Sequence, residues 1–252
     1  MCGILPDIIS NAIINIMDKN TSDAKIPALD RGLDLLEWMA GLMEPVTLTQ
    51  IAQGVGLSVS EVQRPVACLH WRGYLHRSEA GAYSLSGRLA GLAGSHPPHQ
   101  RLHRAAFGVM TEFARLYSES VHLCVPDWDS ALLLLDVPGG GLVRVSLQQG
   151  ARLNALETVS GRILAAHGAL VLPELKKSVG SHLQKIREDG FDHAASSQVV
   201  GITDIGVPVF DSGGAILAVM TVSSFRMKGD LKEERSLVPI LQACARRIAD
   251  RL

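Results

Sequence analysis

Residues 46–77 read VTLTQIAQGVGLSVSEVQRPVACLHWRGYLHR, and this stretch decides the fold. It contains two Ser/Thr-x-x-Glu/Gln boxes, Thr47 with Gln50 and Ser58 with Glu61. Each box predicts the start of a helix, because the two side chains satisfy backbone N–H groups that the first helical turn leaves free. A turn with two glycines separates the boxes. Two short helices joined in this way predict a helix-turn-helix.

The sequence on both sides completes a winged helix-turn-helix. Upstream, apolar residues recur at helical spacing and predict a first helix with one buried face. They are Leu29, Leu33, Leu36, Ala40 and Met43. Downstream, the segments 74–76 and 82–85 predict two short strands, with a turn at 79–81 between them. This hairpin would be the wing.

The C-terminal half alternates between strand-like and helix-like segments. Strands are predicted at 121–125, 131–137, 143–147, 207–210 and 215–223, and helices at 161–167, at 183–188 and from 237 to the end. Between the halves, an amphipathic helix is predicted from about Leu102, after the prolines at 97–98. This order predicts an α+β protein of two domains, the second built on an antiparallel sheet.

Composition and charge narrow the function classes. The chain has 252 residues, of which 47% are hydrophobic, and this suits two globular domains. Residues 21–100 carry six Lys or Arg against seven Asp or Glu, so DNA binding would depend on local placement of charge and on avidity. The four cysteines form no CxxC pair, so no metal site is predicted and a cytoplasmic location fits best. The apolar segment 4–17 is too short to cross a bilayer, and no membrane role is expected.

Catalysis is the main alternative from another class. The sequence has no HExxH, GxSxG, Walker or Rossmann glycine pattern, and the glycines at 139–141 lie between two apolar strands as a hairpin loop. We therefore expect no enzyme activity and no cofactor. The alternative function is a small-molecule-binding or enzymatic domain with a vestigial, weakly DNA-binding helix-turn-helix. A regulator that has lost ligand sensing and acts through protein partners is a further possibility.

Several segments, taken in order, resemble the IclR family of bacterial transcriptional regulators. They are ALDRGLDLLEWMA, the helix-turn-helix stretch quoted above, ETVSGRILAA, KIREDGF and GVPVFDSGGAILAVMTVSS. The resemblance implies a homodimer, often paired into a tetramer, that binds double-stranded operator DNA. It also implies a GAF/PAS-like α/β domain that binds a small effector, commonly a carboxylate or an aromatic metabolite. The expected parts are an extension at 1–27, a winged helix-turn-helix at 28–86, a linker helix and hinge at 87–101, and an effector-binding and oligomerisation domain at 102–252.

The second helix of the motif is expected to read DNA. In a helix-turn-helix this helix lies in the major groove with its N-terminal residues at base edges. The outward residues Ser60, Gln63 and Arg64 can reach bases or phosphates. The full predicted DNA-binding set is Thr47, Ser58, Ser60, Gln63, Arg64, Arg72 and Arg77. The alternative is that these are ordinary solvated residues.

The effector site is predicted mainly from the resemblance. Thr158 to Gly161 lead into a helix whose free N–H groups favour an anion. The resemblance places alternate residues of the last strand, together with a cavity-edge proline, around the effector. The full predicted set is Thr158, Ser160, Gly161, Gln198, Gly201, Pro208, Thr221 and Ser223. The alternative is that the hydroxyls are satisfied within the fold and that Gly161 serves helix packing.

Pro65 lies inside the predicted recognition helix. A proline there removes a backbone hydrogen bond and clashes one turn back, at a cost of about 3 kcal/mol. The resemblance implies a helix-compatible apolar residue at this position. We therefore expect Pro65 to kink the helix after Arg64 and to weaken or redirect DNA binding.

Overall fold

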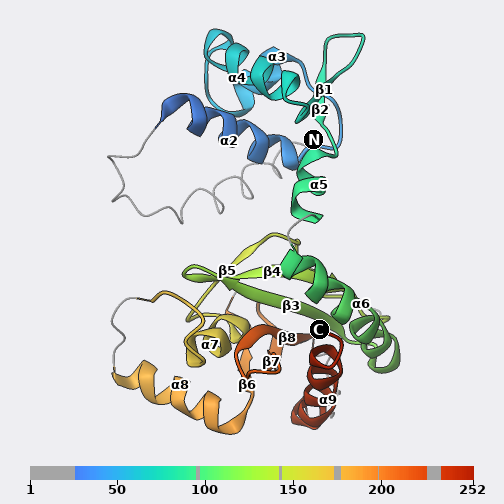
Figure 1. Ribbon diagram of the computed structural model, residues 1–252, viewed down its shortest axis with the longest axis vertical. Helices are drawn as coiled ribbons and strands as arrows, with labels where there is room; N and C mark the ends of the chain where they lie inside the picture. The colour runs from blue at the N-terminus through green and yellow to red at the C-terminus, as the bar shows by residue number, and fades with distance from the viewer. Residues whose placement is uncertain (1–25, 95–96, 142–143, 173–176, 198, 226–233) are drawn as a thin grey trace. The chain divides into compact units, whose positions relative to one another are not determined.

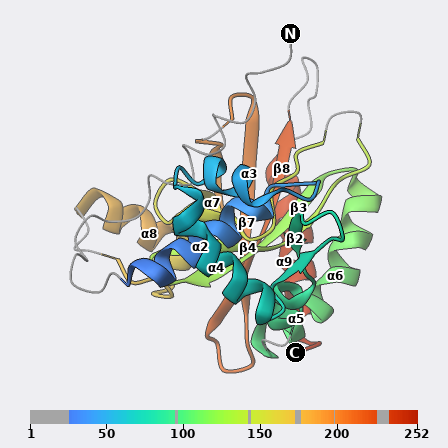
Figure 2. The ribbon, with the colours of Figure 1, turned by 90° about the horizontal axis from the view of Figure 1, so that it is seen from above.

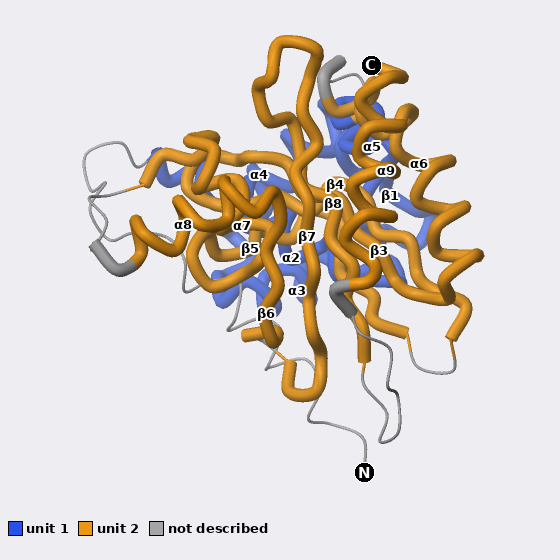
Figure 3. Tube along the Cα trace, turned by 90° about the horizontal axis from the view of Figure 1, so that it is seen from below, with its two compact units in different colours: residues 1–93 blue, residues 94–252 orange. Residues whose placement is uncertain are grey.

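The computed structural model describes residues 26–94, 97–141, 144–172, 177–197, 199–225 and 234–252. The chain separates into two compact units, residues 1–93 and 94–252 (Figure 3). Each unit is described by itself. The predicted extension at 1–27 lies outside the described residues, apart from its last two.

The first unit is a winged helix-turn-helix, as predicted. Its elements are α2 (Pro27–Ala40), α3 (Leu48–Gly54), α4 (Val59–Trp71), β1 (Leu75–Arg77), β2 (Tyr83–Leu85) and α5 (Arg88–Gly94), which ends at the unit boundary (Figure 1). Both capping boxes form: the Thr47 backbone N–H donates to Gln50 Oε1 at 2.8 Å, and the Ser58 backbone N–H donates to Glu61 Oε2 at 3.0 Å. The strands β1 and β2 pair antiparallel as the wing.

The buried face of α2 differs from the predicted one. Leu35 and Met39 are buried against α3 and α4, whereas Leu29 is 56% exposed, Leu33 is 48% exposed and Met43 is 96% exposed. The buried pair Leu35 and Met39 and the exposed pair Leu29 and Leu33 each have a spacing of four residues, so α2 carries apolar side chains on more than one face. The spacing therefore predicted the helix correctly, but it did not show which stripe packs on the neighbouring helices.

The recognition helix α4 continues through Pro65. Val62 and Val66 on its inner face are buried, at 0% and 1% exposure. Pro65 is the seventh helical residue, beyond the first turn whose N–H groups are free in any helix, so the Glu61 carbonyl loses the partner that it would have in a regular helix.

We predict that Pro65→Met stabilises the first unit by up to about 3 kcal/mol, because the substitution restores a backbone hydrogen bond and relieves a clash. Thermal unfolding and operator affinity of the two proteins would be compared, with Ala67→Met on the same helix as the control for added side-chain volume. If Pro65→Met changed neither the unfolding temperature nor the affinity, the proline would have no energetic role.

The second unit is an antiparallel sheet with helices on both faces. Its elements are α6 (Pro97–Tyr117), β3 (Ser120–Asp127), β4 (Ser130–Val137), β5 (Arg152–Asn154), α7 (Val159–Ala166), α8 (Lys177–Asp189), β6 (Asp192–Ala195), β7 (Ile202–Phe210), β8 (Ile216–Phe225), the 3-10 helix η1 (Glu234–Leu237) and α9 (Val238–Ala249). The strand order is β5-β4-β3-β8-β7-β6, and every neighbouring pair is antiparallel. The helices α6 and α8 lie on opposite sides of the sheet (Figures 1 and 2).

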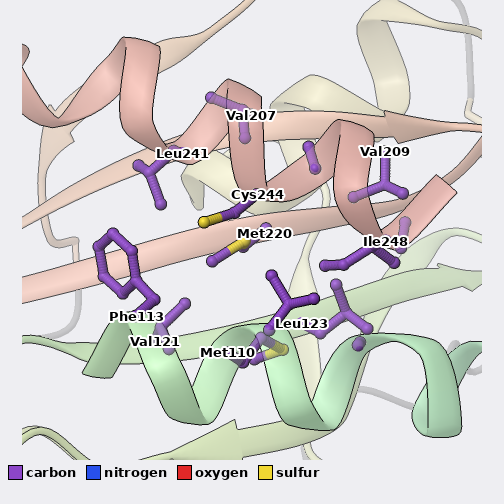
Figure 4. Packing of buried hydrophobic residues seen from close by; sticks show 14 of the residues in the cluster. Met110, Phe113, Val121, Leu123, Val207, Val209, Met220, Leu241, Cys244 and Ile248 are labelled. Atoms are coloured by element: carbon purple, nitrogen blue, oxygen red, sulfur yellow. The ribbon is translucent and has the colours of Figure 1, made fainter. Parts of the chain in front are cut away.

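Strand alternation divides the sheet into two buried faces. Leu123 of β3 and Met220 of β8 point to the α6 and α9 side, where they pack with Phe113, Leu241 and neighbouring side chains (Figure 4). The other face packs against α7 and α8, and Cys124 lies in this second cluster. His122, also on β3, shares the parity of Cys124 and points to the same side as α7.

Three expectations for the second unit need correction. The predicted strand at 143–147 forms no strand over its described part, although Val145 and Leu147 are half-buried and Ser146 Oγ donates to Asp136 Oδ2 of β4 at 2.7 Å. The helix expected from Leu102 already begins at Pro97, since a proline in the first turn has no N–H to lose. The short strands β5 and β6 were not predicted, because their sequences RLN and DHAA carry no β-branched residue.

Candidate nucleic-acid interface and effector cavity

The outward face of α4 carries the predicted base-reading residues. Ser60, Gln63 and Arg64 are all exposed, opposite the buried Val62 and Val66. Arg64 forms no hydrogen bond or ion pair with any part of the chain that the structure describes, so its five N–H donors are directed to solvent. The outward face of α4 can therefore donate hydrogen bonds to acceptors on a DNA duplex.

All three predicted hydroxyls are already hydrogen-bonded within the fold, and Ser60 Oγ lies 3.0 Å from Ser58 Oγ. Thr47 Oγ1 lies 2.9 Å from Gln50 Oε1 in the α3 cap. Ser58 Oγ donates to Glu61 Oε2 at 2.7 Å in the α4 cap. Thr47 and Ser58 therefore serve to cap the two helices. Their bonded hydroxyls are less available than the Arg64 guanidinium for a hydrogen bond to a phosphate.

An ion pair reduces the negative charge beside the reading face. Arg31 of α2 donates to Glu61 Oε1 at 3.1 Å, and the pKa of Glu61 is lowered mainly by hydrogen bonds from Ser58. The acidic residue of the capping box is therefore partly neutralised. This matters for DNA binding, because an unpaired carboxylate near a phosphate would repel it.

The two remaining predicted arginines flank the wing. Arg72 is exposed and caps the C-terminus of α4. Arg77 at the end of β1 lies over the ring of Tyr83, with its guanidinium carbon 5.6 Å from the ring centroid. This contact orients a cation at the wing without neutralising its charge.

A small cavity of about 40 Å³ lies in the second unit, beside the start of α7 and the β3, β7 and β8 strands. Its polar lining consists of His122, Thr158, Ser160, Ser196, Asp204, Thr221 and Ser223. Its apolar lining consists of Val145, Leu147, Leu153, Val159, Val199 and Ile202. The lining therefore combines hydrogen-bonding groups with hydrocarbon side chains.

Hydrogen bonds fix the polar side of the cavity. Ser160 Oγ lies 2.9 Å from Thr221 Oγ1 and 3.5 Å from His122 Nε2, which links α7 to β8 and β3. Ser223 Oγ donates to Asp204 Oδ1 at 2.6 Å, across the β7–β8 pair in which the two residues are directly opposite. The side chains are therefore held in place before any ligand arrives.

Burial alters the protonation of groups on this face of the sheet. It lowers the pKa of His122 to about 4, so this imidazole is neutral at pH 7. Burial raises the pKa of the Cys124 thiol to about 12, which makes the thiol an unreactive donor. The pKa of Asp204 is raised by burial, and the Ser223 hydrogen bond and the charge of Arg162 oppose that rise.

The low pKa of His122 predicts acid sensitivity. The unfolded chain, with an ordinary histidine pKa near 6.5, binds more protons than the folded chain between that pH and about 4. The stability that the neutral imidazole contributes is thus complete above pH 6.5 and is lost as the pH falls towards 4. The loss of unfolding free energy is about 2 kcal/mol at pH 5.

Urea unfolding at pH 7 and pH 5 should show a smaller loss of unfolding free energy for His122→Gln than for the wild type. Substitution of the exposed His76 by Gln is the matched control, and an equal effect of both variants would refute the assignment.

Four of the eight predicted effector residues line the cavity: Thr158, Ser160, Thr221 and Ser223. Gln198 lies outside the described residues. Gly201 and Pro208 are not part of the lining, since Gly201 is exposed with a φ of 87° and Pro208 pairs with Val219 farther along the β7–β8 ladder.

Gly161 also lies outside the lining and has a packing role. A Cβ at this position would lie 2.5 Å from the Asn154 carbonyl oxygen and 2.6 Å from the Ala155 backbone, so only glycine lets α7 approach that segment. Gly206 allows a similar approach on β7, where a Cβ would meet Val159 at 2.7 Å. The two glycines bring Ser160 within reach of the sheet.

His122 and Asp204 were missed by the sequence analysis. His122 faces Thr221 across β3–β8, and Asp204 faces Ser223 across β7–β8. Side-chain alternation along β8 places Thr221 and Ser223 on one face, and the residues opposite them on β3 and β7 share that face. The sequence alone does not give the strand register that identifies these opposite residues.

Comparisons with known proteins identify the family. The IclR helix-turn-helix domain matches residues 28–79, and the bacterial transcriptional regulator IclR C-terminal domain matches residues 174–250. Together the two matches cover just over half of the chain. The chain belongs to the IclR family. It is accordingly a transcriptional regulator with an N-terminal DNA-binding domain and a C-terminal effector-binding domain.

Individual IclR-family relatives are distant but match over most of their length. The HTH-type transcriptional regulator KdgR of Escherichia coli is 26% identical over 222 residues, covering 81% of this chain and 84% of the relative. The Pca regulon regulatory protein of Pseudomonas putida is 24% identical over 99% of this chain and 92% of its own. These relatives agree with the regulator class.

Solved structures share the fold. An IclR homolog from Microbacterium hydrocarbonoxydans, complexed with 4-hydroxybenzoate, superposes with a TM-score of 0.74 at 22% identity, covering 89% of this chain and 98% of the other. The IclR of Thermotoga maritima gives a TM-score of 0.69 at 19% identity, covering 90% and 99%. The predicted two-domain fold is thereby confirmed.

The described residues contain neither a membrane-spanning helix nor a metal-ligating cluster. None of the helices there is long and apolar enough to cross a membrane. No group of three or more metal-ligating side chains gathers in that part of the chain either.

Proposed function

We propose that this IclR-family regulator reads operator DNA with Ser60, Gln63 and Arg64 of α4, and that Arg72, Arg77, Thr47 and Ser58 contact the DNA backbone around them. The observation that carries the proposal is the exposure of these three side chains on one face of a helix whose other face is buried. A helix presented in this way fits the major groove. Residues 28–86 would form the DNA-binding domain and 87–101 the linker and hinge.

The second part of the proposal is that residues 102–252 sense a small molecule in the cavity beside α7. Support comes from the preformed polar side of that cavity and from the IclR homolog complexed with 4-hydroxybenzoate. Thr158, Ser160, Thr221 and Ser223 would contact the ligand, joined by His122 and Asp204. The protein would act in the cytoplasm, without catalysing a reaction.

The third part is a homodimer formed through α2. Leu29 and Leu33 of α2 and Met43, three residues beyond its end, are exposed apolar side chains, and a second copy that covers them would remove them from water. Charge supports the same proposal, since residues 21–100 have no excess of cations and each subunit would therefore make few phosphate contacts. Two linked half-sites compensate for weak binding at each one. A dimer of dimers would extend this arrangement.

A mobility-shift assay with DNA from beside the protein's own gene tests the proposal. We expect a shifted complex at 50 mM salt that weakens as the salt is raised towards 200 mM, as phosphate contacts require. A small ligand of the cavity should change the affinity in the same assay. An enzyme with a vestigial helix-turn-helix would shift neither this fragment nor unrelated DNA.

A further inference from the structure

The cavity beside α7 is small for a sensory site. Its volume of about 40 Å³ holds about three water-sized groups, whereas sites for small organic molecules are typically about 300–1,000 Å³. A ligand can therefore enter only if part of the lining moves. The part with the fewest main-chain hydrogen bonds to the rest of the fold is expected to move, because such segments open at the smallest cost in free energy.

Main-chain hydrogen bonds fix most of the lining. The strands β3, β7 and β8 pair with neighbours in the six-stranded sheet, and the residues from the start of α7 belong to a continuous helix. Leu153 lies in β5, which pairs with β4. In the turn between β6 and β7, the Ser196 N–H donates to the Ile202 carbonyl oxygen at 2.9 Å. These parts of the lining are held in place by the backbone.

The segment 144–147, which contributes Val145 and Leu147 to the lining, is held differently. It belongs to no strand or helix. Among the described residues, no main-chain to main-chain hydrogen bond joins this segment to the rest of the fold. Such bonds to β4 begin only beyond it, where the Gly150 N–H donates to the Leu133 carbonyl oxygen at 2.8 Å. The backbone therefore leaves this wall of the cavity without direct support.

One side chain, that of Asp136 on β4, supplies the missing attachment. Ser146 Oγ donates to Asp136 Oδ2 at 2.7 Å, and the Leu147 backbone N–H also donates to the Asp136 carboxylate. Asp136 is directly opposite His122, so its side chain lies on the same face of the sheet as the cavity. It is not part of the described lining. Asp136 therefore holds the wall from outside the space that a ligand would occupy.

We propose that Asp136 is a positioning residue for this cavity: it holds the segment 144–147 closed as one wall, and breaking its two hydrogen bonds opens that wall to a ligand. Val145 and Leu147 then move outward together, while the sheet, α7 and the β6–β7 turn stay in place. The inference rests on the proposed sensing role of the cavity, and it adds how a ligand gains access.

Hydrogen–deuterium exchange of the full chain, with single amides resolved by mass spectrometry, tests the inference without any ligand. In Asp136→Ala the Leu147 amide should exchange about tenfold faster than in the wild type, because two hydrogen bonds are lost. Asp136→Asn keeps one acceptor oxygen, so its exchange rate should lie between the two. The Gly150 amide, which is bonded to the β4 backbone, should exchange at the wild-type rate in all three proteins.

Ser146→Ala is a second variant, and its exposed position leaves the folded core intact. It removes one of the two hydrogen bonds to Asp136, so the Leu147 amide should exchange faster by a smaller factor of about three. The matched control is Asp189→Ala, which removes a carboxylate from the exposed end of α8. This control should leave the exchange of Leu147 unchanged.

Two results would overturn the inference. One is a Leu147 amide that exchanges equally fast in the wild type, Asp136→Ala and Asp189→Ala. The other is faster exchange in Asp136→Ala that spreads equally to Gly150 and to residues 199–202, since this would show a general loosening of the domain. The proposed function is tested separately: a wild type that fails to shift operator DNA would remove the regulatory role and leave the role of Asp136 standing.

Discussion

Arg64→Ala should lower operator affinity by about 1–3 kcal/mol per subunit, which for a dimer is roughly 30-fold or more. Arg64 is exposed on the outward face of α4, and it has no partner in the described part of the chain that would hold it away from DNA. A guanidinium can bond bidentately to a guanine or clamp a phosphate. Fluorescence anisotropy with operator DNA at fixed salt measures the change.

The matched control for Arg64 is Arg104→Ala on α6, an exposed arginine of the second unit. Both variants remove one positive charge, so a general electrostatic effect would appear in both. Arg64→Lys should recover part of the affinity if the contact is to phosphate and little if it is bidentate to guanine. Equal affinities for Arg64→Ala and Arg104→Ala would contradict a reading role for α4.

The second large effect is expected for the double variant Leu29→Glu and Leu33→Glu. Two carboxylates in the exposed stripe of α2 would face their own copies across a dimer interface, where like charges and lost apolar burial both oppose association. Operator affinity should fall by more than about 100-fold, because the avidity of two half-sites is lost. Analytical ultracentrifugation and anisotropy would measure the two consequences together.

Val171→Glu with Val200→Glu is the control for this double variant. These valines are 58% and 98% exposed in the second unit, and the change of charge is the same. The control should keep the wild-type mass and affinity. A Leu29 and Leu33 variant that remains dimeric would show that α2 is not the interface.

Local signals determined what the sequence could predict. The boxes at Thr47 and Ser58 act within three residues of themselves, so the helix starts were correct whatever lies around them. Pairing between distant residues was beyond local signals. The segment 144–147 was predicted as part of a strand and forms none, although Ser146 and the Leu147 backbone hydrogen-bond to the Asp136 side chain of β4.

In the candidate cavity, too, the residues set by local sequence were predicted and those set by strand pairing were not. Thr158, Ser160, Thr221 and Ser223 were expected from a short segment and one strand, and they meet in the structure. Asp204, the one acidic side chain of the described lining, joins them through cross-strand register with Ser223. Gly161 had both a binding and a packing interpretation, and its contacts with 154–155 favour packing.

Methylation protection of operator guanines tests the central claim, that α4 reads DNA in the major groove, most directly. Guanine N7 lies in that groove, so a recognition helix should shield it from alkylation. We expect two groups of protected guanines about 10 base pairs apart, or a multiple of this, from the wild type, and loss of this protection with Arg64→Ala. A bound complex in which every guanine N7 remains reactive, or protection that persists in Arg64→Ala, would contradict the account.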